Sequence, residues 1–417
     1  MYIHRFHKQC RLSAVLSFFI ALMLMTSVRS VHAEDYQLGV ILGLTGGGAI
    51  WSNEGLEAIT MAVDEINAEG GLLKKYPIKL TVVDDQAKPD VAAQVARNMV
   101  TTTKPNCVIG TWSSSCALAI KPIFAESKTL HLAAISNSED ITRLNPSPYT
   151  YSVVPNTYML AKAISIGLAK LSKEKGWKTY ATITSDYAFG RSMQSNVVTM
   201  LKTLAPELSM TKDVWVPLSE TQWAPHFAAL AAAKPDFINV TLTSDDSVRF
   251  INMATPTGFF KKYPCPGMML SVTELILQKD LLPRGVTALT RAPFFGHPDE
   301  PAMQSLVEKW KKAHNRYPTD WQVLHYDALM ILKQAVEKAG TIETEAVRAA
   351  LHGSTVNTCR GKLTFRTLDN QLICPVYVGT VADDPAYPFP IYHNMQVIPG
   401  AETMRPEAEI VAARETK

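Results

Sequence analysis

QLGVILGLTGGGAIWSNEGLEAITMAVDEINAEGGL, residues 37–72, decides the fold of this chain. The apolar run 38–42 is typical of a buried strand, and the three glycines at 46–48 predict a tight turn. Over residues 53–68 apolar side chains recur at helical spacing, and the glycines at 70–71 predict the end of that helix. A strand, a glycine turn and a helix in this order form the unit that holds phosphates in dinucleotide-binding folds.

A leader typical of exported proteins precedes this stretch. Basic residues come before the apolar run 12–25, and Val31-His32-Ala33 forms a small-x-small cleavage site. The run is shorter than the about 20 apolar residues that a membrane span needs. We therefore expect a signal peptide at 1–33, cleavage after Ala33 and a periplasmic protein. An exported protein meets little NAD or ATP. The glycine turn at 46–48 is therefore expected to lie near a small solute other than a nucleotide.

Removing the leader changes the charge of the chain. Its basic residues are Arg5, Lys8, Arg11 and Arg29, and it holds no acid. The full chain has 41 Lys and Arg and 38 Asp and Glu, so removing these four leaves 37 basic residues against 38 acidic ones. The net charge therefore falls from +3 to −1. This balance argues against a nucleic-acid or anionic membrane partner. The remaining length exceeds one ordinary core, so two domains are expected.

Short apolar runs and amphipathic segments alternate from residue 36, as in βαβ units on a parallel sheet. The fold class expected is α/β. The strand candidates are 38–42, 78–84, 107–110, 130–134, 179–184, 210–216 and 237–242. NPSPYTYSVVPNTY, residues 145–158, carries three prolines and predicts a crossover between two α/β lobes. The tail beyond Tyr387 is rich in proline and is expected to be irregular.

Five cysteines remain after cleavage of the leader. Cys359 and Cys374 flank RGKLTFRTLDNQLI, which predicts a short hairpin, so these two are candidates for a disulfide. Two alternatives stay open for Cys107, Cys116 and Cys265: one pair across the turn after residue 110, or three buried free thiols.

Motifs that signal catalysis are absent from the sequence. It holds no Walker A loop, no His-Glu-x-x-His, no Cys-x-x-Cys and no Gly-x-Ser-x-Gly. The sequence therefore indicates no cofactor, no metal site and no enzyme.

Polar turns follow four of the predicted strands instead. They are 110–115, 135–140, 185–190 and 241–245, rich in hydroxyl side chains. In an open α/β sheet, ligands bind beyond the carboxyl ends of the strands, where helix N-termini offer unpaired N–H groups. Such turns can hold a carboxylate, and the aromatic residues Trp51, Tyr187 and Phe189 are candidates for the walls of the cleft.

The ordered series LTGGGAIWSNEGLEAITMAVDEINAEGGL, VVDDQAKPDVAAQVARNMV, GTWSSSCALAI, SDYAFGRS, HYDALMILKQAVEKAG and GKLTF resembles the solute-binding proteins of ATP-binding-cassette (ABC) importers. The most similar branch is the leucine/isoleucine/valine-type binding proteins. This resemblance implies two Rossmann-like lobes joined by three crossovers and closing on a solute by a hinge. It assigns 36–154 plus 286–352 to one lobe, 155–285 plus 353–385 to the other, and leaves 386–417 as a C-terminal extension.

The resemblance also assigns roles to residues. It implies that Ser114 binds the ligand carboxylate, with Ser136 and Ser138 in the next turn and Phe189 contacting the ligand from the second lobe. Glu274 is the candidate partner for an ammonium group. The candidate ligand-binding residues are Trp51, Ser113, Ser114, Ser136, Ser138, Tyr187, Phe189, Thr243 and Glu274.

The sequence departs from the amino-acid binders in the second polar turn. Where they have a threonine, this chain has Asp140, or Thr142 in a shifted alignment. The solute is expected to be an amino acid of the branched-chain type if Glu274 faces the ligand. If Glu274 is instead solvated, a solute without an amine, such as an aromatic or other organic carboxylate, is the alternative. The expected partner is the permease of an ABC importer, and the expected state is monomeric. The alternative function is a sensory ligand-binding protein that docks on a receptor.

Overall fold

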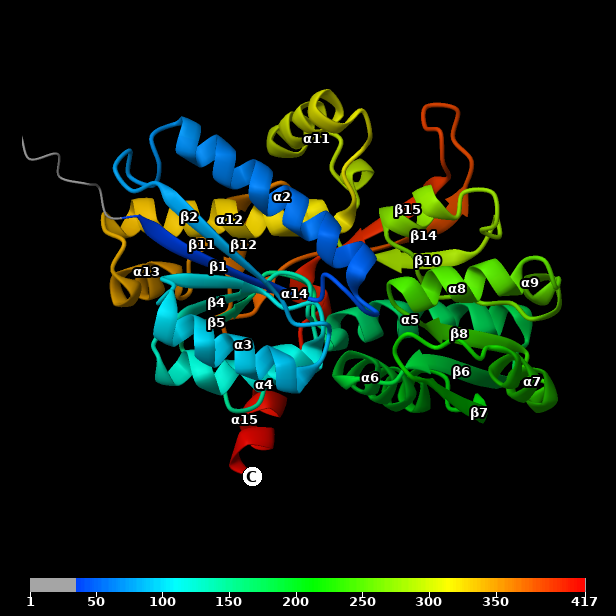
Figure 1. The fold of residues 1–417 in the computed structure, drawn as a ribbon. Helices are drawn as coiled ribbons and strands as arrows, with labels where there is room; N and C mark the ends of the chain where they lie inside the picture. Colours follow the sequence, from blue (N-terminus) through cyan, green and yellow to red (C-terminus); the bar gives the residue numbers. More distant parts are fainter. Residues whose placement is uncertain (1–34, 417) are drawn as a thin grey trace, which may run out of the picture. The chain divides into compact units, whose positions relative to one another are not determined.

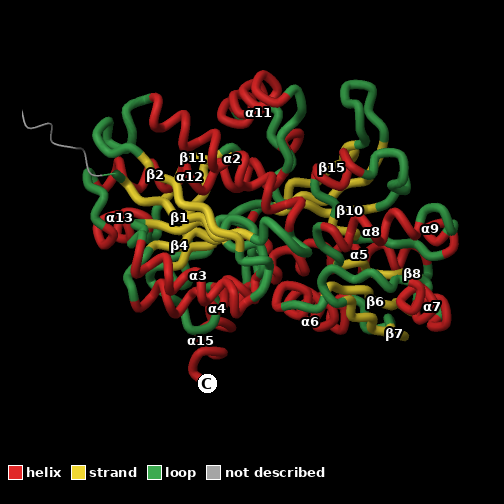
Figure 2. Tube along the Cα trace, in the orientation of Figure 1, coloured by secondary structure: helices red, strands yellow, loops and turns green. Residues whose placement is uncertain are grey.

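The computed structural model describes residues 35–416; the predicted signal peptide and its cleavage after Ala33 lie outside this range. Helices and strands alternate from residue 36 on, and parallel strands dominate the sheets, which confirms the α/β class. Within the described range no helix is both long and apolar enough to cross a membrane. Figure 2 shows the strands in two main groups, each with helices around it.

The first lobe is built on a five-stranded parallel sheet in the order β2-β1-β3-β4-β5. Its strands are β1 (Tyr36–Leu42), β2 (Ile78–Asp84), β3 (Cys107–Gly110), β4 (Leu130–Ala133) and β5 (Thr150–Ser152). Its helices are α2 (Ala49–Ala68), α3 (Pro89–Thr102), α4 (Ser114–Glu126), η1 (Glu139–Ile141), α11 (Pro301–His314), α12 (Asp320–Ala339) and α13 (Thr344–Leu351).

Helices cover both faces of this sheet (Figure 1). Leu38, Val40 and Leu42 of β1 belong to the core that includes α2 and α12, whereas Ile41 packs with α3 and α4 on the other face. Side chains of a strand alternate between faces, so a strand buried on both sides is apolar throughout. This explains why the run 38–42 has no polar residue.

The second lobe contains a parallel group in the order β7-β6-β8 and a mixed group in the order β15-β14-β10-β9. Its strands are β6 (Thr179–Ser185), β7 (Ser209–Val216), β8 (Phe237–Thr241), β9 (Met268–Met269), β10 (Thr287–Thr290), β14 (Val376–Ala382) and β15 (Ile391–Ile398). Its helices are α5 (Thr157–Lys175), α6 (Ala188–Leu204), α7 (Ala224–Ala233), α8 (Asp245–Ala254), α9 (Phe259–Lys262) and α10 (Val272–Leu277).

The chain passes between the lobes three times. Residues 153–156 join β5 to α5, and residues 291–300, with η2 (Phe294–Gly296), join β10 to α11. The return from α13 to β14 runs through a small antiparallel sheet in the order β11-β12-β13. Its strands are β11 (Thr355–Thr358), β12 (Gly361–Phe365) and β13 (Leu372–Ile373).

Two expectations from the sequence concern β10 and the C-terminal tail. β10 lies within the segment 286–352 that was expected in the first lobe, and it pairs with β9 and β14. The tail is not irregular, because β15 adds to β14 as an edge strand. Two short helices follow it, α14 (Gly400–Thr403) and α15 (Glu407–Glu415). Prolines lie between these elements rather than inside them, which a count of prolines does not reveal.

The predicted disulfide between Cys359 and Cys374 is wrong, because the structure has both as buried free thiols. β12 and β13 do form the predicted hairpin. However, Cys359 follows β11 and Cys374 follows β13, and β12 lies between these strands. Two strand spacings are about 9–10 Å, beyond the usual Cα separation of a disulfide. Cys107, Cys116 and Cys265 are buried free thiols as well.

Candidate functional site

The predicted polar turns lie at the carboxyl ends of strands of both lobes. Ser113 and Ser114 follow β3, Ser136 and Ser138 follow β4, and Thr243 follows β8; all five are buried. Ser114 begins α4, and its hydroxyl oxygen accepts hydrogen bonds from the backbone N–H groups of Asn137 (3.2 Å) and Ser138 (3.0 Å). These two bonds hold the turns after β3 and β4 against each other and leave the Ser114 hydroxyl proton available.

Several buried hydroxyl groups at these strand ends lack a partner. Within residues 35–416 the side-chain oxygens of Ser136, Ser138, Thr184 and Ser185 make no hydrogen bond. Buried polar groups in folded proteins are nearly always paired, with protein or with ordered water. Four hydroxyls near the carboxyl ends of β4 and β6 therefore keep unused hydrogen-bonding capacity within residues 35–416.

Aromatic rings from the two lobes meet between these strand ends. Trp112 of the first lobe stacks on Tyr187 of the second, with ring centroids 5.3 Å apart, and Tyr187 contacts Phe189 at 5.7 Å. The Tyr187 hydroxyl lies 3.4 Å from that of Thr243. Burial raises the pKa of Tyr187 far above its usual range, so this phenol stays neutral.

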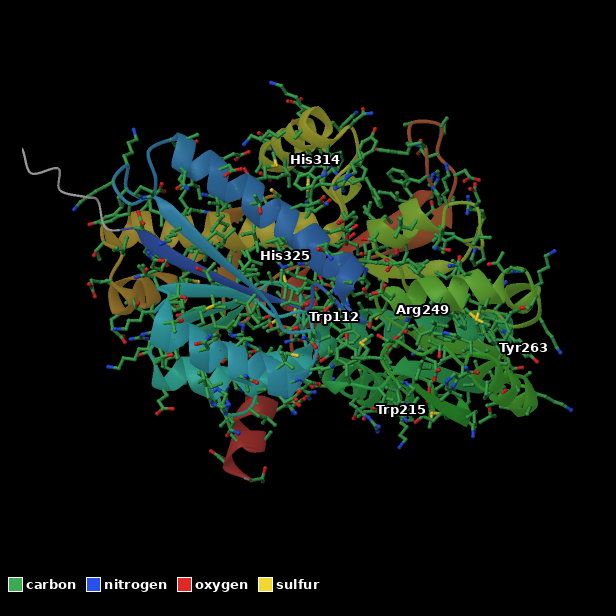
Figure 3. The ribbon with its side chains drawn as sticks, viewed as in Figure 1. Trp112, Trp215, Arg249, Tyr263, His314 and His325 are labelled. Carbon is green, nitrogen blue, oxygen red and sulfur yellow. The ribbon has the colours of Figure 1, made fainter. Side chains whose placement is uncertain are left out.

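The glycine turn before α2 fits closely against these rings. A Cβ on Gly48 would lie 2.3 Å from the Trp112 ring, and one on Gly47 would lie 3.0 Å from the Ser219 hydroxyl of the second lobe. Figure 3 labels Trp112 beside the start of α2. Gly48 is thus required by close packing against Trp112 within the first lobe, and Gly47 lies close to Ser219 of the second.

Trp51 and Glu274 link the lobes on the other side of this turn. The indole nitrogen of Trp51 donates a hydrogen bond of 3.0 Å to Oε1 of Glu274, and Trp51 stacks on Trp321 with centroids 4.1 Å apart. Oε2 of Glu274 accepts from the backbone N–H and the hydroxyl of Ser271, in a capping box at the start of α10. Burial raises the pKa of Glu274 to about 7. Both oxygens of this carboxyl therefore already accept hydrogen bonds within the protein.

Arg291 was not predicted from the sequence, yet it lies at the centre of the aromatic groups. Its side chain is 2% exposed, and its guanidinium lies 5.0 Å from the ring centroid of Trp321 and 5.7 Å from that of Phe189. Burial lowers its pKa to about 10. A basic residue directly after the buried strand TALT is the only signal that the sequence offers for it.

Asp320 begins α12 and supports this arrangement. One of its oxygens accepts from the hydroxyl of Thr290 and from the backbone N–H groups of Arg291 and Ala292. The other accepts from the backbone N–H of Val272 at 2.8 Å. These bonds fix the turn after β10 to the starts of α10 and α12, so they position the side chain of Arg291.

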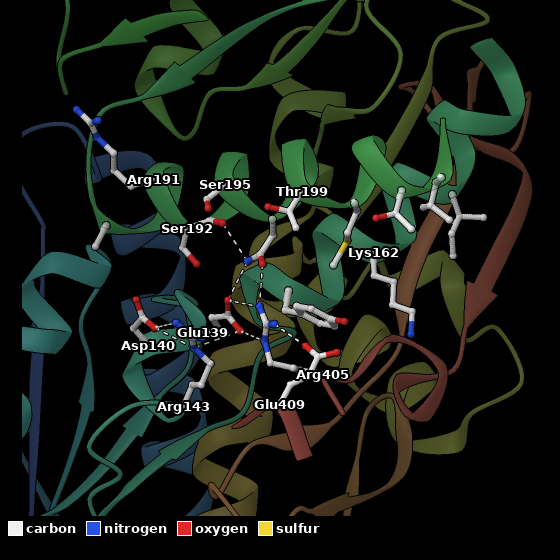
Figure 4. A pocket seen from close by; sticks show the side chains of 17 residues that line it. Glu139, Asp140, Arg143, Lys162, Arg191, Ser192, Ser195, Thr199, Arg405 and Glu409 are labelled. Atoms are coloured by element: carbon white, nitrogen blue, oxygen red, sulfur yellow. Dashed lines mark hydrogen bonds and ion pairs between the residues drawn. The ribbon is translucent and has the colours of Figure 1, made fainter. Parts of the chain in front are cut away.

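A crevice of about 810 Å³ lies beside this region, between η1, α5, α6 and the C-terminal helix α15. Arg405 lies in it and donates two hydrogen bonds, of 2.8 and 2.9 Å, to Glu139 of the first lobe. It also donates to Asn196 of α6 (2.9 Å) and to Glu409 (2.8 Å), as Figure 4 shows. The C-terminal tail therefore bonds to both lobes, a contact that the sequence did not predict.

Metal ligands do not gather anywhere in the described part of the chain, since no three His, Cys, Asp or Glu side chains lie close enough together to hold an ion.

Comparisons with known proteins identify the fold. A family model described as periplasmic binding protein matches residues 35–386. The chain belongs to this family. A curated relative of this periplasmic binding protein, Leu/Ile/Val-binding protein homolog 7 of Brucella suis, is 24% identical over 332 residues, which cover 76% of this chain and 81% of the relative.

Solved structures agree with this assignment. A periplasmic binding protein from Burkholderia mallei has a TM-score of 0.79 at 23% identity and covers 90% of this chain and 98% of its own. An ABC-transporter solute-binding protein from Rhodopseudomonas palustris, in complex with benzoate, has a TM-score of 0.77 at 18% identity, with 88% and 97% covered. The resemblance to leucine/isoleucine/valine-type binding proteins and the two-lobed fold that it implies are confirmed.

Proposed function

We propose that this periplasmic binding protein captures a small organic solute between its lobes by hinge closure and delivers it to the permease of an ABC importer. The candidate groups come from both lobes, so a bound solute makes contacts that exist only when the lobes are together. Those contacts are what shifts the population toward the closed form.

The unpaired buried hydroxyls at the ends of β4 and β6 carry this proposal. Ser136 and Ser138 belong to the first lobe and Thr184 and Ser185 to the second. A solute with polar groups would pair these hydroxyls, as buried polar groups usually are paired. The proposed ligand-binding residues are Trp51, Ser113, Ser114, Ser136, Ser138, Tyr187, Phe189, Thr243 and Glu274.

The solute proposed is a small carboxylate, either an amino acid of the branched-chain type or an aromatic or other organic acid. The name of the Brucella relative supports the first class, and the benzoate complex from Rhodopseudomonas supports the second. Both classes have one carboxylate and an apolar body, which suits polar turns that face aromatic rings.

Mass spectrometry of small molecules released by denaturing the purified protein tests this function directly. Thermal-shift measurements with amino acids, benzoates and aliphatic acids extend the test to solutes lost in purification, and small-angle scattering reports compaction. We expect at least one carboxylate to raise the melting temperature and to compact the protein. If a broad solute library gives neither effect, the proposal is wrong.

Two conservative variants locate the site. Ser136→Ala and Ser138→Ala remove hydroxyls that bond to nothing within residues 35–416, so the free protein should keep its stability while its affinity for the solute falls. Ser165→Ala is the matched control, because the Ser165 hydroxyl is also buried and unpaired but lies within α5. Equal affinities in all three variants would contradict the placement of the site.

Export and delivery follow from the same proposal. We propose that the signal peptide is cleaved after Ala33 and that the mature protein is a periplasmic monomer. The intact mass of the protein from a periplasmic fraction tests the cleavage, and light scattering tests the oligomeric state. Uptake of the labelled solute by cells that lack this chain tests delivery; unchanged uptake would leave a sensory role instead.

A further inference from the structure

Arg291 is a buried cation without a hydrogen-bonded partner. Its side chain is 2% exposed, and within residues 35–416 its guanidinium donates no hydrogen bond and makes no ion pair. A guanidinium has five N–H donors and stays charged in proteins. Taking such a charge out of water is unfavourable unless an anion compensates it.

The neighbouring carboxylates do not fill this role. Asp320 uses one oxygen for Thr290 and for backbone N–H groups, including that of Arg291 itself, and the other for Val272. Glu274 uses its oxygens for Trp51 and Ser271. Both influence the charge of Arg291 from a distance, but neither accepts a bond from its side chain.

The aromatic rings beside Arg291 contact its guanidinium, and its side-chain donors are unused within residues 35–416. Trp321 of the first lobe and Phe189 of the second lie at cation–π distance, 5.0 and 5.7 Å from ring centroid to guanidinium carbon. Aromatic contacts attract the cation but accept none of its N–H bonds. A planar carboxylate matches the fork of these donors through two parallel bonds.

We propose that Arg291 is the receptor for the carboxylate of the solute, and that the solute is a monocarboxylate with an apolar body and no required ammonium group. This rests on the proposed function and names the solute class of the same site. Phe189 and Trp321 lie at cation–π distance from the guanidinium, Trp51 stacks on Trp321, and Glu274, the carboxyl predicted to hold an amine, lies in the helix cap of α10 and bonds to Trp51.

Matched solutes on the wild-type protein test the charge requirement without any substitution. Isothermal titration with benzoate and benzamide compares a carboxylate with its neutral isostere, and leucine with 4-methylpentanoate compares an amino acid with its deaminated analogue. We expect at least a hundredfold preference for the carboxylate of the first pair, and 4-methylpentanoate to bind at least as tightly as leucine.

Arg291→Met tests the residue. We expect at least a hundredfold loss of affinity for the preferred carboxylate, while the melting temperature of the free protein stays equal or rises because an unpaired buried charge is gone. Arg191→Met is the control, since Arg191 is half exposed and paired with Asp186; its affinity should stay within twofold of the wild type.

The outcomes separate the two proposals. No binding of any solute by the wild type overturns the proposed function. Binding of neutral solutes only, equal binding of benzoate and benzamide, or undiminished affinity in Arg291→Met overturns the role of Arg291 and leaves the function standing. A tenfold preference for leucine over 4-methylpentanoate overturns the solute class. A large fall in the melting temperature of Arg291→Met with affinity retained would make Arg291 a structural residue.

Discussion

Arg360 and Arg291 are both buried guanidinium groups, yet they differ in what they contact. Arg360, in the turn between β11 and β12, donates to Asp327 of α12 at 3.0 Å and to the carbonyl of Val153 in the first crossover at 2.9 Å. Arg291 donates no side-chain hydrogen bond within the described chain. Both arginines belong to segments that join the lobes, but Arg360 has a buried carboxylate as its partner, whereas the Arg291 side chain has aromatic rings beside it and no hydrogen-bonded partner within residues 35–416.

The largest effect is expected at the paired arginine. Arg360→Met leaves the Asp327 carboxylate buried without its cation, and breaking such a pair costs about 3–5 kcal/mol. Chemical denaturation of the free protein measures this loss. The double variant Arg360→Met/Asp327→Leu should recover a large part of it, because no uncompensated charge remains. If Arg360→Met were as stable as the wild type, the contrast with Arg291 would disappear.

A second, smaller effect concerns the buried carboxyl of Glu274, which has no cationic partner within hydrogen-bond distance in the described chain. The pKa of Glu274 is raised by burial to about 7 from an ordinary value of 4.5. Between these two pH values the folded protein retains a proton that the unfolded chain releases, so the free energy of unfolding falls as pH rises toward 7 and then levels off. The full shift corresponds to on the order of 3 kcal/mol.

Glu274→Gln should remove this contribution to the pH dependence, because glutamine does not titrate. The helix cap should remain, since glutamine also serves at this position of a capping box. Denaturant midpoints at several pH values between 4.5 and 7 measure the slope. Glu337→Gln, at an exposed position of α12, is the control and should leave the slope unchanged. A wild-type slope retained in Glu274→Gln would mean that another group titrates.

Arg405, in the C-terminal tail, is intermediate between the fully buried Arg360 and an exposed arginine, because its side chain is partly buried and paired. Arg405→Ala removes its bonds to Glu139, Asn196 and Glu409, and we expect a loss of about 1–3 kcal/mol. Glu409→Gln breaks only the exposed pair, and its effect should stay below about 0.5 kcal/mol. Equal unfolding free energies for the two variants would show that the bridge from the tail to both lobes contributes nothing.

The smallest effect is expected from reducing agent. Cys359 and Cys374 lie near Arg360 but are free thiols, so dithiothreitol should leave the denaturation midpoint unchanged. Alkylation of the unfolded, unreduced protein should modify all five cysteines of the mature chain. A mass that lacks two labels would show a disulfide beside Arg360. It would contradict the assignment of Cys359 and Cys374 as free thiols.

Much of the fold could be predicted because several of its strands, such as β3 and β8, are buried along their whole length. The segments 107–110 and 179–184 were expected as strands and are β3 and β6 within one residue. Continuous apolar runs, glycine turns and amphipathic helices are local signals, so they survive in a single sequence. β15 was missed because an edge strand with one solvated face resembles a polar tail.

The site could be predicted only as far as its turns. Small hydroxyl residues after strands indicated where the groups gather, and Trp51 and Glu274 do meet. The position of Arg291 depends on Trp321 and Phe189, which lie far away along the chain. No local pattern signals that a charge is buried by such distant rings. The disulfide failed for a related reason, since the sequence does not reveal which strand lies between two others.

β15 has a consequence for any shortened version of this protein. It pairs with β14 at the edge of the second sheet and begins beyond residue 386, where the match to the family ends. A chain cut at that boundary would leave the backbone N–H and C=O groups of β14 open on one side. Open strand edges recruit strands from other molecules. Because β15 covers the edge of β14, a version truncated before β15 is expected to lose solubility before it loses its fold.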